Sequence, residues 1–244
     1  MCKTVLITGS SRGIGLACAR AFFLSGYNVA LNCVKNEKDA AQAAACLNSA
    51  DKPNKAIFYK ADVSRFDACK ELVDFVKRSF SRVDCLINNA GKACAGLFTQ
   101  MSERDYTDVI QTNLLSAMHL SRLILPDMAA RREGVIINIS SVWGVKGASC
   151  EAAYAASKGG LNALTLSLAK EYGPCGIRVN AISCGAIDTD MNNNLTEEEK
   201  NAFSEKIALG RFGAPGEIAQ TALFLASDAA SYITGAVVSA DGGM

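Results

Sequence analysis

The chain has 244 residues, of which 50% are hydrophobic, and a formal net charge of +1. A chain of this length and apolar content can bury a substantial core, and we expect residues 1–244 to form a single α/β domain. Its Lys and Arg residues are dispersed singly or in pairs, without the basic stripe that nucleic acid or anionic lipid would require, so we expect neither partner.

Cysteine and histidine usage bears on compartment and metal binding. The ten cysteines include no Cys-x-x-Cys pair, so we expect free thiols. The one histidine, His119, has no cysteine at ligand spacing, so we expect no metal site. The chain runs from Met1 almost directly into an apolar strand and has no apolar run of membrane-spanning length. We therefore expect a soluble, cytoplasmic protein without a signal peptide or a membrane span.

Short apolar, β-rich segments alternate with longer helical patterns along the chain. The seven predicted strands are 4–8, 28–33, 55–60, 84–88, 134–139, 178–183 and 236–239. These strands are apolar on both faces, as expected when helices cover both sides of a parallel sheet. The pattern predicts a Rossmann-type doubly wound sheet of seven mostly parallel strands with helices on both faces.

The first strand leads into Thr8-Gly-Ser-Ser-Arg-Gly-Ile-Gly15, which opens a helix predicted over 14–25. Between a strand and a helix, these glycines permit a tight turn and a close approach of the backbone to a pyrophosphate. The spacing is Gly-x-x-x-Gly-x-Gly rather than the commoner Gly-x-Gly-x-x-Gly, so the motif alone is weak. The cofactor contacts predicted here are Gly9, Ser11, Arg12, Gly13, Ile14 and Gly15.

The end of the second strand bears on the choice of cofactor. In NAD-selective sites a carboxylate there holds the ribose hydroxyls, but segment 30–36 contains none. Arg12 and Lys35 could instead neutralise a 2′-phosphate, so we predict NADP(H) rather than NAD(H). Further cofactor contacts are predicted at the ends of the second, third and fourth strands: Asn32, Lys35, Asp62, Val63, Asn89, Ala90 and Gly91.

An acid/base pair lies in the helix predicted over 151–172. Tyr154 and Lys158 are four residues apart and therefore share one helical face. A fixed positive charge favours the phenolate, so we predict that Lys158 lowers the pKa of Tyr154 toward working pH. The phenol could then exchange protons with a carbonyl.

The stretch 189–213 departs from the strand–helix alternation. Asn192-Asn-Asn194 is predicted to be a loop and Thr196 to cap a following helix, which together could form a lid over a site. An ordinary surface excursion is the alternative. Residues that could line an apolar pocket, or simply pack in the core, are Trp143, Val145, Ala148, Phe203 and Leu209.

Together these motifs resemble the short-chain dehydrogenase/reductase family, in its compact form, over essentially the whole chain. The resemblance implies that Tyr154 is the general acid/base and that Lys158 lowers its pKa and bonds the nicotinamide ribose. It implies that Ser141, rather than the adjacent Ser140, orients the substrate oxygen. Asn113 matches the family's fourth catalytic member, which is associated with a water-linked proton path to the lysine.

The segment after the sixth predicted strand also matches the family. Gly185, Ile187 and Thr189 fall where the family bonds the nicotinamide carboxamide. Cys184 stands where the family usually has proline, and without the proline restraint on φ we expect a looser nicotinamide.

Within the family the overall resemblance is greatest to 3-oxoacyl-[acyl-carrier-protein] reductases. This implies reduction of a 3-oxoacyl thioester in fatty acid biosynthesis by a homotetramer. Arg131 and Arg132 could offer an acidic acyl carrier protein a basic contact near the pocket mouth, or could be solvated surface residues. Pro174 and Cys175 offer no basic side chain where carrier-dependent relatives can present one, which weakens the carrier reading. Another ketone, a sugar or a hydroxysteroid as substrate, and a non-catalytic NADP-binding protein, are the alternatives.

Overall fold

The computed structural model describes residues 2–192 and 196–244. Its seven strands form one sheet in the order β3-β2-β1-β4-β5-β6-β7, and every pairing is parallel. The strands are β1 (Thr4–Ile7), β2 (Asn28–Cys33), β3 (Ala56–Lys60), β4 (Cys85–Asn88), β5 (Gly134–Ser141), β6 (Ile177–Cys184) and β7 (Val237–Ala240). All seven predicted strands are confirmed, and the sheet is entirely parallel.

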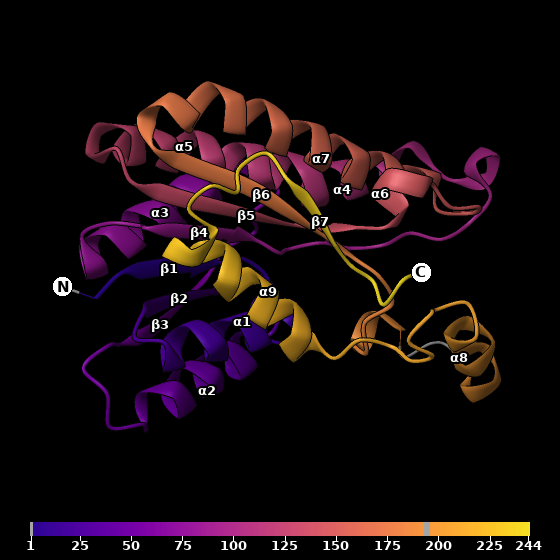
Figure 1. Cartoon of the computed structure of the whole chain (residues 1–244), viewed down its shortest axis with the longest axis horizontal. Coiled ribbons are helices and arrows are strands. Elements are labelled where there is room, and N and C mark those ends of the chain that lie inside the picture. The colour runs from indigo at the N-terminus through magenta and orange to yellow at the C-terminus, as the bar shows by residue number, and fades with distance from the viewer. Residues whose placement is uncertain (1, 193–195) are drawn as a thin grey trace.

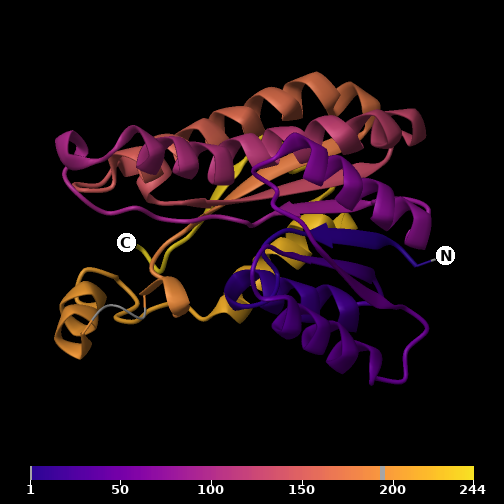
Figure 2. The ribbon, with the colours of Figure 1, turned by 180° about the vertical axis from the view of Figure 1, so that it is seen from behind.

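Helices cover both faces of this sheet, as predicted (Figure 1). They are α1 (Gly13–Leu24), α2 (Glu37–Asn48), α3 (Phe66–Phe80), α4 (Glu103–Ile110), α5 (Ser116–Arg131), α6 (Trp143–Lys146), α7 (Ala152–Tyr172), α8 (Glu197–Ser204) and α9 (Pro215–Ala226). Val5 and Ile7 of β1 pack in a core with α1, α2 and α9, whereas Leu6 between them packs with α3 and α5. The opposite view shows the same two layers, with α3, α5 and α7 on one side (Figure 2). Alternate residues of one strand thus serve two cores.

The helical stretch from α4 to α5 is interrupted. Between α4 and α5 lies the π-helical turn η2 (Gln111–Leu115). A π turn accommodates an extra residue and shifts the side chains around it. The buried Asn113 sits in this turn, and its amide bonds the backbone of Lys92 on a neighbouring loop. A tertiary contact therefore overrides the uniform helical pattern.

Parallel strands place all their carboxyl ends at one edge of the sheet. The strand order reverses at β1, whose neighbours are β2 and β4. A reversal of this kind separates the two flanking connections and opens a crevice beyond the strand ends, where doubly wound proteins bind ligands. The segments that follow β1, β2, β4, β5 and β6 consequently face a common site.

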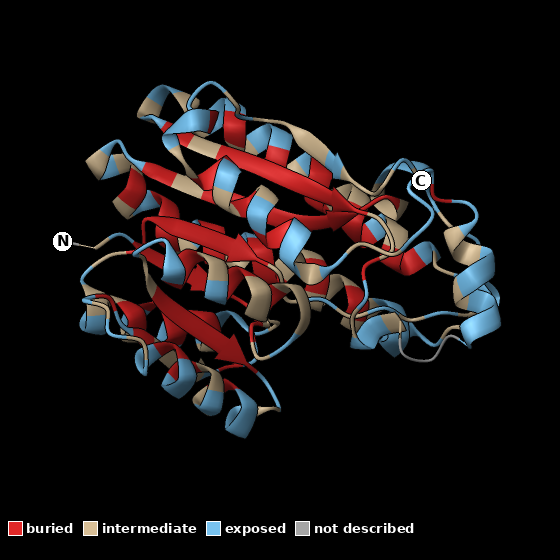
Figure 3. Cartoon of the chain, turned by 60° about the horizontal axis from the view of Figure 1, so that its bottom comes forward, coloured by how far each residue is buried: buried red, intermediate tan, exposed pale blue. Residues whose placement is uncertain are grey.

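The segment 189–213 is an insertion between β6 and α9, as predicted. It contains the short helix η4 (Asp190–Asn192) and α8, which Thr196 caps through a reciprocal bond with Glu199. Asn193 and Asn194, predicted as loop, lie outside the described residues. Helix α8 contributes no buried residue (Figure 3), and a bridge between Ile187 and Gly213 joins the two ends of the insertion.

The helices within the described ranges lack the combination of length and apolar character needed to cross a bilayer.

A buried amide network ties α7 to the centre of the sheet. Asn88 Nδ2 donates to Asn138 Oδ1 at 2.8 Å, and Asn138 Nδ2 donates to Thr165 Oγ1 at 2.8 Å. Thr165 in turn donates to the Leu161 carbonyl within α7. The network fixes the helix that carries Tyr154 and Lys158 against the strand that carries Ser141.

Asn138→Ala should therefore destabilise the protein by about 2–4 kcal/mol, because it leaves buried partners on Asn88 and Thr165 unsatisfied. The matched control is Ser183→Ala, since the Ser183 hydroxyl is buried on the neighbouring strand without a bond to any described residue. That variant should change the stability little or raise it. Urea unfolding measures both, and equal effects of the two substitutions would contradict the network's role.

Candidate active site

A cleft of about 740 Å³ opens at the carboxyl edge of the sheet, between the glycine turn and α7. It brings together most of the residues that the sequence predicted for the cofactor and for catalysis. Those that line it are Gly9, Ser11, Arg12, Gly13, Ile14, Lys35, Asp62, Val63, Asn89, Ala90, Gly91, Ser141, Tyr154, Lys158, Gly185, Ile187 and Thr189. Gly15, Asn32 and Asn113 are not among the lining residues.

The three glycines of the turn meet different requirements. Gly9 and Gly13 have φ values of +60° and +55°, which a side chain disfavours. Gly15 is a packing glycine, because a Cβ there would lie 2.5 Å from the Gly9 carbonyl oxygen. The turn therefore exposes backbone at the start of α1 without side-chain cover. This arrangement fits a pyrophosphate, which backbone N–H groups at a helix N-terminus bind.

Hydrogen bonds to β4 hold the glycine turn in place. Thr8 Oγ1 accepts from the backbone N–H groups of Asn89 and Ala90 at 3.0 and 2.9 Å. Asn89 Nδ2 returns bonds to the carbonyls of Thr8 and Gly9 at 2.8 and 3.0 Å. The sequence analysis did not single out Thr8, although its position directly before the first glycine was a usable signal.

Asn32 is a structural residue, which corrects its prediction as a cofactor contact. Its side chain is buried and donates to the carbonyls of Tyr59 and Ala61 at 3.2 and 3.0 Å. Its Oδ1 accepts from the Gly9 N–H at 3.4 Å. Asn32 thus joins the ends of β2 and β3 to the glycine turn, and its donors are directed away from the cleft.

Charged side chains of both signs lie at the nucleotide end of the cleft. Arg12 and Lys35 both line the cleft, and both are exposed. The first carboxylate after β2, Glu37, pairs with Lys60 at 3.2 Å. Arg12 is not an isolated charge, however, because its Nη1 lies 3.0 Å from Asp190 Oδ2. The cradle and its cations fit a phosphorylated dinucleotide.

Tyr154 lies on α7 and is buried against Val109 and Ala153. Burial raises the pKa of Tyr154 to about 12, and a hydrogen bond with Ser141 opposes this increase in part. The prediction that Lys158 lowers the pKa of Tyr154 is wrong for this arrangement, because burial and the charges of Cys184 and Glu151 raise this pKa and Lys158 is not among the groups that lower it. The phenol holds its proton at neutral pH, as a proton donor must.

Lys158 is buried beside Tyr154, with its Nζ 5.7 Å from the centre of the Tyr154 ring. The ammonium donates to the Ile139 carbonyl at 2.7 Å. Burial lowers the pKa of Lys158 to about 8, so the charged form still predominates at neutral pH. Spacing on a helix predicted the pairing of the two residues, but the carbonyl at the end of β5 determines where the ammonium is held.

The two serines at the end of β5 have different partners. The Ser140 hydroxyl bonds the Lys158 backbone carbonyl at 3.4 Å, so it joins β5 to α7. The Ser141 hydroxyl bonds Tyr154 and accepts from the Trp143 N–H at 3.2 Å. Of the two serines, Ser141 is the one whose hydroxyl interacts with the Tyr154 phenol.

Cys184 occupies the end of β6, in register with Ser141 on one side and Ala240 on the other. It lines the cleft, and its thiol is buried. Burial raises the pKa of Cys184 to about 12, so the thiol is neutral at physiological pH. The ladder on both sides holds the backbone at this position.

Asn113 lies behind the cleft and braces it. Its Oδ1 accepts from the Lys92 N–H at 2.9 Å, and its Nδ2 donates to the Lys92 carbonyl at 2.9 Å and to Ser157 Oγ at 3.0 Å. Ser157 continues to the Tyr154 carbonyl at 2.7 Å. A Cβ on Gly91 would lie 3.4 Å from Asn113 Oδ1 and 3.6 Å from Lys158 Nζ. The geometry therefore groups Asn113 with Lys158 and Tyr154.

An ion pair in the cleft was missed from the sequence. Lys92 Nζ lies 3.1 Å from Asp108 Oδ2, and both residues line the cleft. Lys92 directly follows Gly91, so its position was a usable signal, but no pattern indicated the partner on α4.

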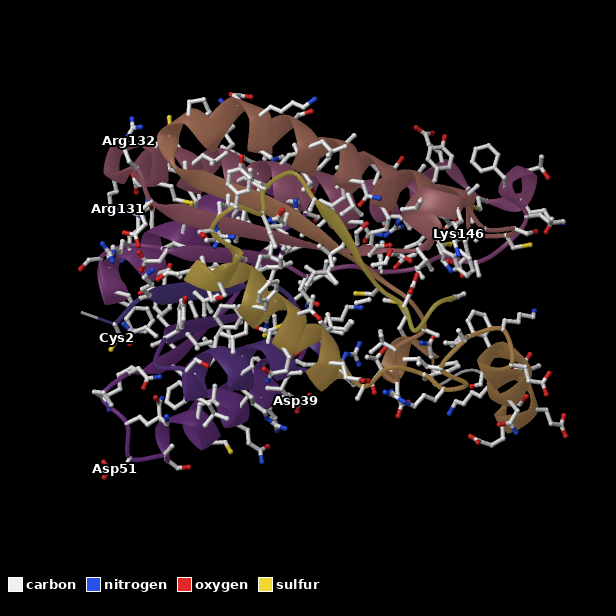
Figure 4. All side chains as sticks on the ribbon, in the orientation of Figure 1. Cys2, Asp39, Asp51, Arg131, Arg132 and Lys146 are labelled. Carbon is white, nitrogen blue, oxygen red and sulfur yellow. The ribbon has the colours of Figure 1, made fainter. Side chains whose placement is uncertain are left out.

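Arg131 and Arg132 do not lie at the mouth of this chain's cleft, which corrects the predicted carrier contact. They directly precede β5 and therefore lie at the amino edge of the sheet, opposite to Lys146, which follows β5 (Figure 4). Arg131 Nη2 donates to the Val83 carbonyl and Arg132 Nη2 to the Pro174 carbonyl, both at 2.9 Å. In a parallel sheet, the order along the chain alone excludes them from the carboxyl edge.

The predicted apolar wall lies outside the volume described above. Trp143 packs beside Tyr154, whereas Val145 and Leu209 are 66% and 67% exposed. Phe203 contacts Phe212 within the insertion. These side chains and Ala148 are not among those lining the cleft.

Across residues 2–192 and 196–244, His, Cys, Asp and Glu side chains form no group of three or more that could hold a metal ion.

The lowered pKa of Lys158 predicts a pH effect on stability. Between about pH 8 and 10.5 the unfolded chain holds more protons on Lys158 than the folded chain, so this residue makes stability rise with pH in that window. The stability of the wild type relative to Lys158→Met should therefore increase from the lower to the upper end of the window. Urea unfolding at both ends measures this difference, and Lys170→Met, at an exposed site on α7, is the control. A difference that is independent of pH would contradict the burial of a charged Lys158.

Comparison with known proteins identifies the family of this chain. Residues 9–244 match a family model described as Enoyl-(Acyl carrier protein) reductase. The chain is 42% identical over 242 residues to a 3-oxoacyl-[acyl-carrier-protein] reductase of Chlamydia trachomatis, covering 99% of this chain and 97% of the relative. A protein of the same name from Thermotoga maritima is 39% identical over 99% of this chain and 97% of its own length. An uncharacterized oxidoreductase of Bacillus subtilis is 38% identical over 100% of this chain and 99% of its own length.

The matched lengths include the glycine turn, the segments that follow β4 and β5, and the whole of α7. The chain belongs to the short-chain dehydrogenase/reductase family, whose members are oxidoreductases acting on CH–OH and C=O groups.

Proposed function

We propose that this protein reduces the 3-oxo group of an acyl thioester to a 3-hydroxyl, with NADPH as the hydride donor. The observation that supports this most directly is the shared cleft, in which a glycine turn suited to pyrophosphate and the hydroxyls of Ser141 and Tyr154 lie together. One half of the site suits a dinucleotide and the other a developing oxyanion. A cleft that served nucleotide binding alone would not require the second half.

The proposed mechanism uses the two hydroxyls as donors to the substrate oxygen. Reduction places negative charge on this oxygen, and preorganised donors in a dry site stabilise it. Bound NADPH supplies the hydride to the carbonyl carbon. Tyr154 gives its proton to the oxygen, while Ser141 orients the carbonyl. A phenol with a pKa of about 12 remains protonated at working pH and can act as this acid.

Lys158 and Asn113 support this step in the proposed mechanism. The Lys158 ammonium lies beside the Tyr154 ring and would stabilise the phenolate left after proton transfer. It would also bond the ribose of the bound nucleotide. Asn113 holds the Gly91–Lys92 backbone next to Lys158. A proton path from solvent to Lys158 would run beside Asn113 and this backbone.

The preference for NADP(H) is part of the proposal. Arg12 and Lys35 line the nucleotide end of the cleft, and segment 30–36 offers no carboxylate to bond a 2′-hydroxyl. Gly185, Ile187 and Thr189 also line the cleft, where they would contact the carboxamide. Asp62 and Val63, after β3, would contact the adenine.

An acyl chain is the proposed class of substrate tail. Segments that follow the carboxyl ends of β4, β5 and β6 expose large apolar side chains, and Leu97, Phe98, Val145 and Met191 are 51% or more exposed. Exposed apolar side chains at this edge of the sheet would contact an acyl chain. The names of the relatives from Chlamydia trachomatis and Thermotoga maritima agree with a 3-oxoacyl thioester.

The family model carries the name of a different reaction, reduction of an enoyl thioester. The names of the relatives from Chlamydia trachomatis and Thermotoga maritima support the 3-oxo group as the group reduced.

Resemblance to the family also suggests the assembly, the localisation and the pathway of the protein. We propose that residues 1–244 act as one domain in a cytoplasmic homotetramer of fatty acid biosynthesis. Light scattering tests the tetramer, and a monomer with full activity would exclude it.

Oxidation of NADPH with a panel of substrates tests the function. Acetoacetyl thioester should be consumed with NADPH, and much more slowly with NADH, while crotonyl thioester, sugars and hydroxysteroids should give little turnover. Preferred turnover of the crotonyl substrate would favour the enoyl reaction, and preferred turnover of a sugar or steroid would replace the thioester. Tight NADPH binding without turnover of any substrate would indicate a protein that only binds the nucleotide.

Tyr154→Phe tests the acid. It should lower kcat for acetoacetyl thioester reduction by about 10²- to 10⁴-fold and leave NADPH affinity unchanged, because it removes only the donated proton. The matched control is Tyr172→Phe at the other end of α7, which should keep full activity. Retained turnover in Tyr154→Phe would exclude Tyr154 as the proton donor.

A further inference from the structure

The nucleotide end of the cleft contains a carboxylate, Asp190, that the proposed function does not use. Asp190 lines the cleft, and its Oδ2 lies 3.0 Å from Arg12 Nη1. The neighbouring Thr189 packs on the glycine turn, with its Cγ2 3.5 Å from the position a Cβ of Gly13 would take. The segment after β6 therefore rests directly on the turn and places an anion beside its arginine.

This placement is unfavourable for a phosphate that must bind Arg12. The Asp190 carboxylate already engages the guanidinium that would bind it. A phosphate monoester carries up to two negative charges and matches the arginine fork in bidentate fashion, so it competes well with a single carboxylate. The Arg12–Asp190 pair is largely exposed, with side-chain exposures of 64% and 53%. Breaking such a pair costs little.

We propose that Asp190 sets the size of the preference for NADP(H) by competing with the 2′-phosphate for Arg12. The inference rests on the proposed cofactor. When the 2′-phosphate binds, Arg12 exchanges the Asp190 carboxylate for phosphate oxygens, so part of the attraction is offset by the lost ion pair. NAD(H) has no such phosphate and leaves the pair intact. Asp190 therefore weakens NADP(H) binding selectively.

The test measures dissociation constants by calorimetry at one fixed ionic strength, without acyl substrate. NADPH and NADH are titrated into the wild type, Asp190→Asn, Arg12→Gln and the double variant. Asp190→Asn should bind NADPH about two- to five-fold more tightly than the wild type, the range expected from release of an exposed ion pair. Its affinity for NADH should not change, and in the Arg12→Gln background the substitution should have no effect on either nucleotide.

Asp188→Asn is the matched control. It makes the same change of charge two residues earlier, at an exposed position that is not one of the described residues lining the cleft. It should leave both affinities unchanged. An equal gain for Asp188→Asn and Asp190→Asn would attribute the effect to net charge and overturn the proposal.

Three further results would also overturn it. Unchanged NADPH affinity in Asp190→Asn would show that Asp190 does not compete with the 2′-phosphate for Arg12. An equal gain for NADPH and NADH would place the competing group at the pyrophosphate rather than the 2′-phosphate. A gain in NADPH affinity from Asp190→Asn that persists in the Arg12→Gln background would show that the effect of Asp190 does not act through Arg12. Because no acyl substrate is present, these results do not depend on which carbonyl compound the protein reduces.

Discussion

The parallel direction of all seven strands is the constraint on which the site depends. It places the glycine turn after β1, the turn after β4, the serines ending β5 and the segment after β6 at one edge. Residues more than a hundred positions apart in the chain thereby line one cleft. The same constraint explains why Arg131 and Arg132, which precede β5, are excluded from it.

Much of the polar chemistry near the cleft serves to hold it rather than to bind ligands. Asn89, Asn32 and Asn113 each use side-chain amides to bond backbone groups of neighbouring loops. Such bonds satisfy buried polar groups and fix the loops to the ends of the strands. The groups left facing the cleft are the backbone of the glycine turn, a small number of cations and carboxylates, and the hydroxyls of Ser141 and Tyr154.

The sequence was sufficient for the strands, the glycine turn and the Tyr154–Lys158 pairing, because each follows from local periodicity or from residue spacing. It was insufficient where long-range contacts decide. The π turn at Asn113 and the partners of Arg12 and Lys92 all involve residues distant in the chain. Neither pattern nor spacing reveals how far a side chain is buried, so the pKa of Tyr154 was predicted in the wrong direction.

The central claim is that burial keeps the Tyr154 phenol protonated as the acid of the site. Carbon-13 NMR of ring-labelled tyrosine, with Tyr154→Phe to assign the signal, measures this pKa directly in protein without added nucleotide. The account predicts that Tyr154 titrates well above an ordinary tyrosine, at a pKa of about 12. Titration near neutral pH would contradict it and would show that the Lys158 charge, rather than burial, governs the phenol.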